Sequence, residues 1–313
     1  MENHPEMQYL KLLHRILENG EESRDRTGVG TLRLIGETLK FKMSEGFPLL
    51  TTKRVWFKGV AIELLWMISG KTNIRPLVTK GVNIWNEWPF VHYLQKCGVN
   101  STELKKHRPQ VWNCMLTSFV EQITKDVDFA NKWGDLGPVY GYQWRHWQNP
   151  DGTEIDQLAQ AVEQIRTNPD SRRIVVTAWN PSDIAAMEVS GLPPCHMTFQ
   201  FFVVNGKLSL TMYQRSVDSF LGLPFNIASY ALLLRMVAHI TDMEPNELTL
   251  FLGDTHLYLN HLDQVHIQLE RMPFPFPELY FRRDIHHIDD FAYEDIVLGD
   301  YKHHSPIKGD IAI

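Results

Sequence analysis

Cys195 is the side chain best suited to nucleophilic chemistry in this sequence, because a thiolate attacks electrophilic carbon readily. It follows Pro193 and Pro194, which favour a stiff loop or strand edge of the kind where reactive residues lie. A lone cysteine is equally compatible with an ordinary role as a small buried apolar residue. A cation near the sulfur would favour the reactive thiolate, since positive charge lowers the pKa of a thiol.

The segment that follows Cys195 is expected to supply that cation. Two strand-like runs within residues 198–218 flank Asn205-Gly206, a strong signal for a two-residue hairpin turn. With these residues in the turn, Val204 faces Lys207 and the two runs pair antiparallel.

Continued outward, this register pairs His196 with Arg215 and Cys195 with Ser216. Opposed residues have Cβ atoms about 5 Å apart, so the thiol lies within one residue of a guanidinium. Regular pleating places Arg215 and Cys195 on opposite faces, so we expect a bulge or a strong twist that turns Arg215 toward the sulfur. A cysteine hydrolase built on Cys195 and His196 is disfavoured, because adjacent strand residues point to opposite faces.

Glu63 is a carboxylate in an otherwise apolar helical segment, between Ile62 and Leu64 and close to Trp66. Partial burial would raise its pKa toward the range that general acid/base catalysis requires. The alternative is a helix carboxylate that simply reaches solvent.

The elements that must position these residues follow from periodicity and turn signals. Helices are expected at 5–19, 57–69, 156–167 and 227–240, the last apolar nearly all round and therefore buried. Strands are expected at 31–35, 38–43 and 174–178, with the first two joined as a hairpin by Gly36-Glu37. Because strands and helices do not alternate regularly, we predict an α+β fold with a large sheet, formed by one domain over residues 1–313 with a partly helical insertion at about 92–127.

The composition indicates a globular cytoplasmic protein. The chain has 313 residues, 43% of them hydrophobic and 22% charged, with neither a secretory leader nor an apolar run of membrane-spanning length. Its three cysteines lack the spacing of a disulfide framework or a zinc site, which suits a reducing compartment. A net charge of -6 argues against a general nucleic-acid binder, so an anionic ligand would need a local arginine cluster.

The sequence around Cys195 resembles the thymidylate synthase family, and further motifs follow in family order from about Arg24 to the C-terminus. The matching segments are Leu192-Pro193-Pro194-Cys195-His196, Gln214-Arg215-Ser216 with Asp218, Asp25-Arg26-Thr27-Gly28, Phe47-Pro48-Leu49-Leu50-Thr51-Thr52-Lys53, Glu63-Leu64-Leu65-Trp66, Asn83-Ile84-Trp85, Leu136-Gly137-Pro138-Val139-Tyr140-Gly141, Ser171-Arg172-Arg173, Pro224-Phe225-Asn226-Ile227-Ala228-Ser229-Tyr230 and Gly253-Asp254-Thr255-His256-Leu257-Tyr258.

The resemblance implies reductive methylation of dUMP by 5,10-methylenetetrahydrofolate, giving dTMP and dihydrofolate through an adduct of the Cys195 thiolate at uracil C6. The folate would supply both the carbon and the hydride, so neither a metal nor a nicotinamide is expected. The resemblance also implies the thymidylate synthase fold, with a large mixed sheet flanked by helices and with sheets packed across the interface of a homodimer.

The resemblance carries roles onto individual residues of this sequence. The catalytic residues would be Cys195, Glu63, Tyr140 and Arg215. The residues that bind dUMP would be Arg26, Arg172, Arg173, Arg215, Ser216, Asp218, Asn226, His256 and Tyr258. The residues that bind the folate would be Trp85, Asp218, Leu221, Phe225, Ala312 and Ile313. Arg172 and Arg173 would reach the phosphate of the other subunit across the dimer interface.

Other interpretations remain open. Arg172-Arg173 is also readable as an exposed pair before a strand. A dUMP hydroxymethylase of the same superfamily would let water quench the intermediate in place of hydride, whereas Asn226 disfavours the deoxycytidylate version, which resembles this family but carries Asp there. A non-catalytic nucleotide-binding or RNA-binding regulator on the same fold is a third possibility, weakened by the presence of Cys195 and Glu63 and by the acidic charge.

Overall fold

The structure is a computed structural model that describes residues 4–24 and 28–310. The chain forms two compact units. The first comprises Met1–Ala61, Ala159–Val176 and Cys195–Ile313, and the second comprises Ile62–Leu158 and Thr177–Pro194.

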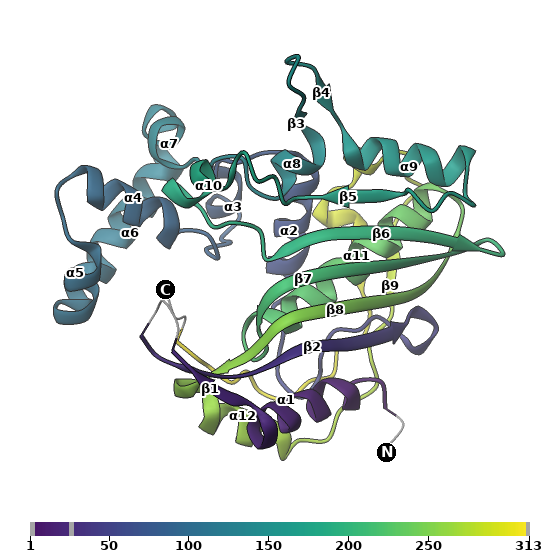
Figure 1. The fold of residues 1–313 in the computed structure, drawn as a ribbon, viewed down its shortest axis with the longest axis horizontal. Coiled ribbons are helices and arrows are strands. Elements are labelled where there is room, and N and C mark those ends of the chain that lie inside the picture. The colour runs from purple at the N-terminus through teal and green to yellow at the C-terminus, as the bar shows by residue number, and fades with distance from the viewer. Residues whose placement is uncertain (1–3, 25–27, 311–313) are drawn as a thin grey trace. The chain divides into compact units, whose positions relative to one another are not determined.

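The first unit is built on a six-stranded sheet in the order β1-β2-β8-β7-β6-β5 (Figure 1). The pairs β1–β2, β2–β8 and β6–β7 are antiparallel, whereas β7 and β8 are parallel, so the sheet is mixed. The strands are β1 (Glu21–Ser23), β2 (Thr31–Lys42), β5 (Val175–Thr177), β6 (His196–Val204), β7 (Lys207–Asp218) and β8 (Glu244–Tyr258). The predicted α+β class with a large sheet is confirmed.

The hairpin expected at Gly36-Glu37 is wrong. Residues 31–42 form the single strand β2, in which Ile35 pairs with Asp254 and Glu37 pairs with Leu252 on β8. Gly36 does have a positive φ of 81°, but the strand continues through it. Because β8 is long enough to pair with both halves of β2, pairing with a distant strand outweighs the local turn signal.

One face of the sheet is covered by helix α11 (Gly222–Ile240), which connects the parallel strands β7 and β8 and lies behind them in Figure 1. Leu232, Leu233 and Leu234 are fully buried, as are Met212 of β7 and Leu250 of β8. Each such side chain contributes roughly 1.5–3 kcal/mol through burial. The helix is long and apolar enough to cross a membrane, but 78% of its most apolar window is buried inside the protein, as expected for a core helix.

The remaining elements of the first unit surround this sheet and helix. Helices α1 and α12 contact each other, and strands β9 and β10 form a small antiparallel pair. These elements are α1 (Met7–Asn19), α12 (Leu262–Leu269), β9 (Leu279–Phe281) and β10 (Ile296–Leu298), with 3₁₀ turns at Met43–Glu45, Leu259–His261, Ile288–Asp290 and Tyr293–Asp295.

The second unit is mainly helical. Helix α2 begins in the first unit and continues into the second, and α9 begins in the second and ends in the first. The elements are α2 (Phe57–Ile68), α3 (Arg75–Val78), α4 (Glu87–Lys96), α5 (Ser101–His107), α6 (Pro109–Lys125), α7 (Val127–Trp133), α8 (Gly141–Arg145), β3 (Trp147–Gln148), β4 (Glu154–Ile155), α9 (Gln157–Thr167) and α10 (Ile184–Ser190).

Residues 92–127, expected as a partly helical insertion, lie mostly within helices α4, α5 and α6 and pack through aromatic side chains. Phe119 of α6 lies 5.4 Å from both Phe90 and Tyr93 of α4, and 5.7 Å from Phe129 of α7, measured between ring centres. The Phe119–Phe129 pair is edge-to-face and the other two pairs are tilted, and aromatic contacts at these distances add to the free energy gained by burial. The Asp126 side chain accepts a hydrogen bond from the backbone of Phe129 and thereby caps α7.

Candidate active site

The hairpin that carries Cys195 has the predicted turn. Asn205 and Gly206 have positive φ values of 52° and 73°, and Val204 pairs with Lys207. Positive φ at both central residues is what a type I′ turn requires, and this turn matches the twist of the two strands.

The register changes at the far end of this hairpin. A shift between His196 and Thr198 pairs His196 with Gln214, so the predicted pairing of His196 with Arg215 is wrong. The cause is a β-bulge in β6, where the step from His196 to Thr198 on β6 is opposed by the single step from Gln214 to Tyr213 on β7. Such bulges re-aim the side chains that follow them.

Beyond the bulge, Cys195 lies beside Arg215, and the predicted pairing of Cys195 with Ser216 is also wrong. The backbone N–H of Arg215 donates to the Cys195 carbonyl at 2.9 Å. Arg215 Nη2 lies 3.9 Å from Cys195 Sγ, so the expected irregularity that turns the guanidinium toward the sulfur is confirmed. A cation at this distance from a half-buried thiol favours the thiolate and therefore nucleophilic attack.

Next to the cysteine lies a set of uncharged polar groups. The Asn226 side-chain amide, on α11, contacts His196 Nε2 and lies 3.3 Å from Gln214 Oε1. Burial lowers the pKa of His196 to about 4, so the imidazole is neutral at pH 7. Amide and imidazole groups in a buried array can donate to and accept from the edge of a planar heterocycle.

Asp218 ends β7 and caps the turn into α11. Its Oδ1 accepts hydrogen bonds from the backbone N–H groups of Phe220 and Leu221, both at 2.9 Å. Leu221 and Phe225 are half-buried at the start of the helix. The structure therefore brings three of the predicted folate residues, Asp218, Leu221 and Phe225, to the same end of α11.

His256 and Tyr258 project from the same side of β8, as their spacing predicts, with ring centres 5.2 Å apart. His256 Nδ1 lies 2.9 Å from Asp254 Oδ1, and Arg33 Nη1 lies 3.3 Å from the other carboxylate oxygen. The hydrogen bond with His256 and the charge of Arg33 both hold the pKa of Asp254 below its usual range. The hydrogen bond between the Asp254 carboxylate and His256 Nδ1 fixes the orientation of the imidazole.

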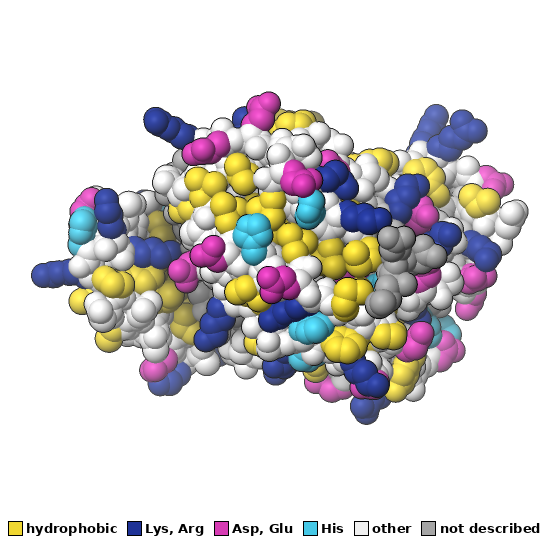
Figure 2. Space-filling view, turned by 90° about the horizontal axis from the view of Figure 1, so that it is seen from below, with side chains coloured by type: hydrophobic (Ala, Val, Ile, Leu, Met, Phe, Trp, Pro, Cys, Tyr) yellow, Lys and Arg dark blue, Asp and Glu magenta, His cyan; other side chains and the backbone are white. Residues whose placement is uncertain are grey.

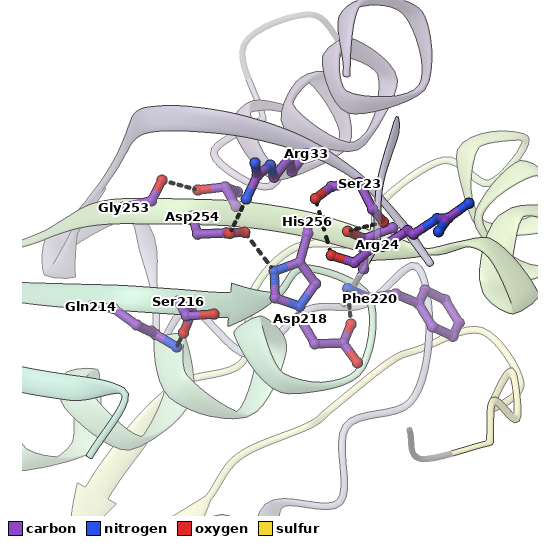
Figure 3. A network of polar contacts seen from close by, with 12 residues as sticks. Ser23, Arg24, Arg33, Gln214, Ser216, Asp218, Phe220, Gly253, Asp254 and His256 are labelled. Atoms are coloured by element: carbon purple, nitrogen blue, oxygen red, sulfur yellow. Dashed lines mark hydrogen bonds and ion pairs between the residues drawn. The ribbon is translucent and has the colours of Figure 1, made fainter. Parts of the chain in front are cut away.

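The parallel pairing of β7 with β8 brings these groups side by side. Asp218 lies opposite His256, and Ser216 lies opposite Asp254. Figure 3 shows the Asp218 carboxylate beneath the His256 ring, with Ser216 on the same strand as Asp218. Hydroxyl, carboxylate and imidazole groups thus meet at neighbouring strand ends, which suits recognition of a polar ligand.

In the second unit, Glu63 of α2 is paired with Trp85. Trp85 Nε1 donates to Glu63 Oε1 at 2.7 Å, and the Trp85 and Tyr140 rings lie 5.7 Å apart. Desolvation raises the pKa of Glu63 to about 7, and the hydrogen bond from Trp85 opposes that rise. Tyr140 has a φ of 30°, a conformation that non-glycine residues rarely adopt and that is concentrated at functional sites.

The remaining predicted site residues are placed less tightly or fall outside the described ranges. Arg172 and Arg173 are exposed and lie just before β5. Arg26, Ala312 and Ile313 lie outside the described residues, so their predicted roles stay predictions.

Lys53 is a buried lysine to which the sequence pattern assigned no individual role. It is only 5% exposed, its Nζ donates to the Phe220 carbonyl, and the same atom lies 3.6 Å from the centre of the Phe220 ring. Burial lowers the pKa of Lys53 to about 7, and the charge of Asp218 opposes that change. Its position directly after the residues at 49–52 gives no local signal of burial, because lysine is among the residues most often exposed.

The first unit holds a thiol beside a guanidinium, which equips the chain for group transfer through a covalent intermediate. The second unit holds a carboxyl group with a pKa of about 7. Comparison with known proteins identifies the class as the methyltransferases. Residues 7–313 match the family described as thymidylate synthase. A thymidylate synthase from Mycoplasma mobile is 50% identical over 306 residues, which covers 98% of this chain and 99% of that protein.

The chain therefore belongs to the thymidylate synthase family. It is a transferase of dTMP biosynthesis, with dUMP as the methyl acceptor and methylenetetrahydrofolate as the cosubstrate.

Proposed function

We propose that Cys195 performs thymidylate synthesis by adding its thiolate to C6 of dUMP. The observation that carries this proposal is the contact of Arg215 Nη2 with Cys195 Sγ at 3.9 Å, which the β6 bulge creates. Addition of sulfur at C6 turns the uracil ring into an enolate, which makes C5 nucleophilic toward the one-carbon unit of the folate. The cysteine thus supplies the electron pair that an uncatalysed uracil lacks.

The later steps need a proton acceptor and a reductant. Glu63, with Tyr140 supporting the water around it, would relay the proton lost from C5 as tetrahydrofolate is expelled. A carboxyl group with a pKa of about 7 is suited to this relay, because it exchanges protons readily at neutral pH. Hydride from the folate then reduces the exocyclic methylene, and departure of Cys195 releases dTMP and dihydrofolate.

The nucleotide is proposed to bind through charge and through its edge groups. Arg215 and Ser216, together with Arg26, would bind the phosphate, since arginine offers a bidentate fork to phosphate oxygens. Asn226 would read the uracil edge, supported by its contacts with His196 and Gln214. His256 and Tyr258 would hold the ribose hydroxyl, and the predicted contact of Asp218 with dUMP is supported by its place opposite His256.

The folate is proposed to lie against apolar and aromatic side chains, with one carboxylate accepting from the pterin. Asp218, Leu221 and Phe225 would contribute from the start of α11, and the family resemblance adds Trp85. Ala312 and Ile313 would close over the bound ligands and exclude water from the reactive intermediate.

An analogue of dUMP with fluorine at C5 tests the cysteine's role. Fluorine cannot leave as a cation, so the adduct of Cys195, nucleotide and folate should persist and be visible as added mass on the intact protein. The Cys195→Ala variant should show no added mass, and Cys97→Ala, which removes an exposed thiol, should retain it. Adduct formation by Cys195→Ala would refute the proposal.

We also propose that the protein acts as a homodimer through the uncovered face of its sheet. Ile35, Tyr213 and Phe251 are 72%, 41% and 47% exposed on that face, and they line a hollow of about 480 Å³. Apolar side chains gathered on one exposed surface are typical of a contact with another protein. A second copy of this chain is the proposed occupant.

Mixing two inactive variants tests whether Arg172 and Arg173 act across this interface. Cys195→Ala lacks the nucleophile, and an Arg172→Ala, Arg173→Ala double variant lacks the donated guanidiniums. If the arginines serve the other subunit, mixed dimers contain one intact site, and activity should return to roughly a quarter of the wild-type level. An absence of recovery in a mixture shown to contain mixed dimers would overturn the proposal.

A cytoplasmic location is proposed as well. It is supported by the spacing of the three cysteines, which lacks the pattern of a disulfide framework and therefore suits a reducing compartment. Cell fractionation with an antibody against the chain would test it, and recovery outside the cytoplasmic fraction would contradict it.

A further inference from the structure

The turn at residues 218–221, between β7 and α11, has its backbone groups held by other parts of the chain. On the N–H side, Phe220 and Leu221 donate to Asp218 Oδ1, and Ser219 donates to the His256 carbonyl at 2.8 Å. Figure 3 shows the resulting arrangement of Asp218, Phe220 and His256. The conformation of the turn therefore sets the direction of the Asp218 carboxylate.

The carbonyl groups of the same turn are held by two residues from the start of the chain. Tyr9 of α1 donates its hydroxyl to the Ser219 carbonyl at 3.0 Å. Lys53 Nζ donates to the Phe220 carbonyl and lies over the Phe220 ring. Tyr9 is fully buried and Lys53 is 5% exposed, so both hydrogen bonds are shielded from competing water.

A buried carboxylate fixes the segment that carries Lys53. Glu6 is fully buried, and its two oxygens accept four hydrogen bonds, from the amide and the hydroxyl of Thr51 and of Thr52, at 2.6–2.9 Å. With both oxygens of the carboxylate engaged, the backbone directly before Lys53 has little freedom to move. The start of the chain thus forms a rigid support beneath the turn.

On its other side, the turn contacts the end of the described chain. The Phe220 and His261 rings lie 5.3 Å apart, and His261 Nε2 lies 2.8 Å from the Asp310 carbonyl oxygen. A Cβ added to Gly309 would lie 3.1 Å from the Phe220 ring, so this glycine packs tightly against it. Phe220 is therefore held between Lys53 and the segment that leads to the last three residues.

We propose that Tyr9 and Lys53 are positioning residues for the folate half of the reaction. They hold the turn at 218–221 so that Asp218 and Leu221 present a fixed surface to the folate and Phe220 supports residues 309–310. Tyr9 and Lys53 act on the folate only indirectly, by fixing the conformation of this turn. The inference rests on the proposed folate roles of Asp218 and of the C-terminal residues.

The test is the kinetics of the full-length variants Tyr9→Phe and Lys53→Met. Each should raise the KM for methylenetetrahydrofolate about ten-fold, the size of effect expected from one lost buried hydrogen bond. The KM for dUMP should stay within about two-fold, because Asp218 is the one proposed dUMP-binding residue that lies in this turn and the other proposed dUMP contacts lie outside it. Because both residues hold the same turn, the double variant should show less than the product of the two single effects. Tyr280→Phe and Lys80→Met, at exposed positions, are matched controls that should change neither KM.

The alternative outcomes separate this inference from the proposed folate site. Equal rises in both KM values, or a fall in kcat and melting temperature with both KM values unchanged, would indicate a merely structural role and overturn it. Should Lys53→Met fail to fold, Tyr9→Phe, which removes a single oxygen atom, decides the question. Asp218→Asn is measured alongside: if it raises the folate KM while Tyr9→Phe does not, the inference fails and the folate site stands. If Asp218→Asn leaves the folate KM unchanged, the proposed folate site fails and the inference fails with it.

Discussion

At the scale of single residues, we propose that the Arg215 guanidinium activates Cys195. Arg215 would point away from the thiol in a regular ladder, and the bulge between His196 and Thr198 brings it to 3.9 Å from the sulfur. Near a thiol, a fixed cation stabilises the thiolate without itself changing protonation state, because arginine stays charged at every physiological pH.

Replacing this guanidinium should slow the reaction of the thiol with an alkylating agent. In Arg215→Gln without ligands, we expect the rate of Cys195 alkylation by iodoacetamide at pH 7 to fall about ten-fold, since a smaller fraction of the thiol is ionised. Peptide mapping by mass spectrometry measures the rate at Cys195 separately from Cys97 and Cys114. Arg15→Gln, which removes a surface partner of Glu37, is the matched control and should leave the rate unchanged. An unchanged rate in Arg215→Gln would show that the contact does not activate the thiol.

The pKa of Glu63 predicts a dependence of kcat on pH. Desolvation raises this pKa to about 7, so the carboxyl group is mostly protonated below pH 7 and mostly ionised above it. Since the proposed proton relay from C5 needs the ionised form of Glu63, kcat should rise as pH increases through about 7 and then level off. In Glu63→Gln, kcat should fall about a hundred-fold or more and lose this rise. A pH profile of the same shape in the variant would assign the titration to another group.

At the scale of elements, the sequence predicted those structures whose signals are local. The Asn205-Gly206 hairpin, the helices within 57–69 and 156–167 and the buried helix α11 all follow from turn chemistry or periodicity. Gly36-Glu37 carried a similar turn signal, but β8 pairs across it. A sequence pattern cannot weigh a local turn against pairing with a strand some two hundred residues away, and for the same reason it gave no role to Lys53 or Tyr9.

The turn at Asn205-Gly206 offers a test of the claim that local turn residues determine this hairpin. Gly206 has a φ of 73° and open space around its Cα, so Gly206→Ala adds backbone strain without a clash. We expect the free energy of unfolding to fall by about 1 kcal/mol, the usual cost of holding alanine in the left-handed region. Gly222→Ala, at the start of α11 with ordinary contacts of 3.8–4.0 Å, should cost nothing or stabilise slightly. Urea unfolding measures both, and equal effects would refute the argument from φ.

At the scale of the whole molecule, the surface carries both charged and apolar side chains. Figure 2 shows one face on which basic side chains are interspersed with acidic ones around an apolar centre. The net charge of -6 leaves the sequence-based expectation in place that the protein is not a general nucleic-acid binder, because affinity for a phosphate backbone comes from clustered Lys and Arg. The family resemblance identified the candidate site residues, and the structure added their contacts; their roles stay proposals because bound ligands and a second subunit are what would show them.

The exposed sheet face should control both assembly and activity. Phe251→Asp places a charge in the apolar hollow shared with Ile35 and Tyr213, so we expect a dimer to dissociate into monomers. If Arg172 and Arg173 are supplied by the other subunit, activity should fall about a hundred-fold or more in parallel. Sedimentation and turnover are measured at the same protein concentration, with Ile267→Asp, at a similarly exposed position on α12, as the control. A fully active monomer would contradict the proposed dimer.

The central claim is that Cys195 carries out the methylation of dUMP, and a turnover assay tests it most directly. Purified protein is mixed with dUMP and methylenetetrahydrofolate, and dihydrofolate is followed by absorbance. The nucleotide product is identified by mass spectrometry. The Cys195→Ala variant is assayed in parallel. We predict that dTMP and dihydrofolate appear in equal amounts with the wild-type protein and that neither forms with the variant. Production of 5-hydroxymethyl-dUMP without dihydrofolate, or dTMP formation by Cys195→Ala, would contradict the claim.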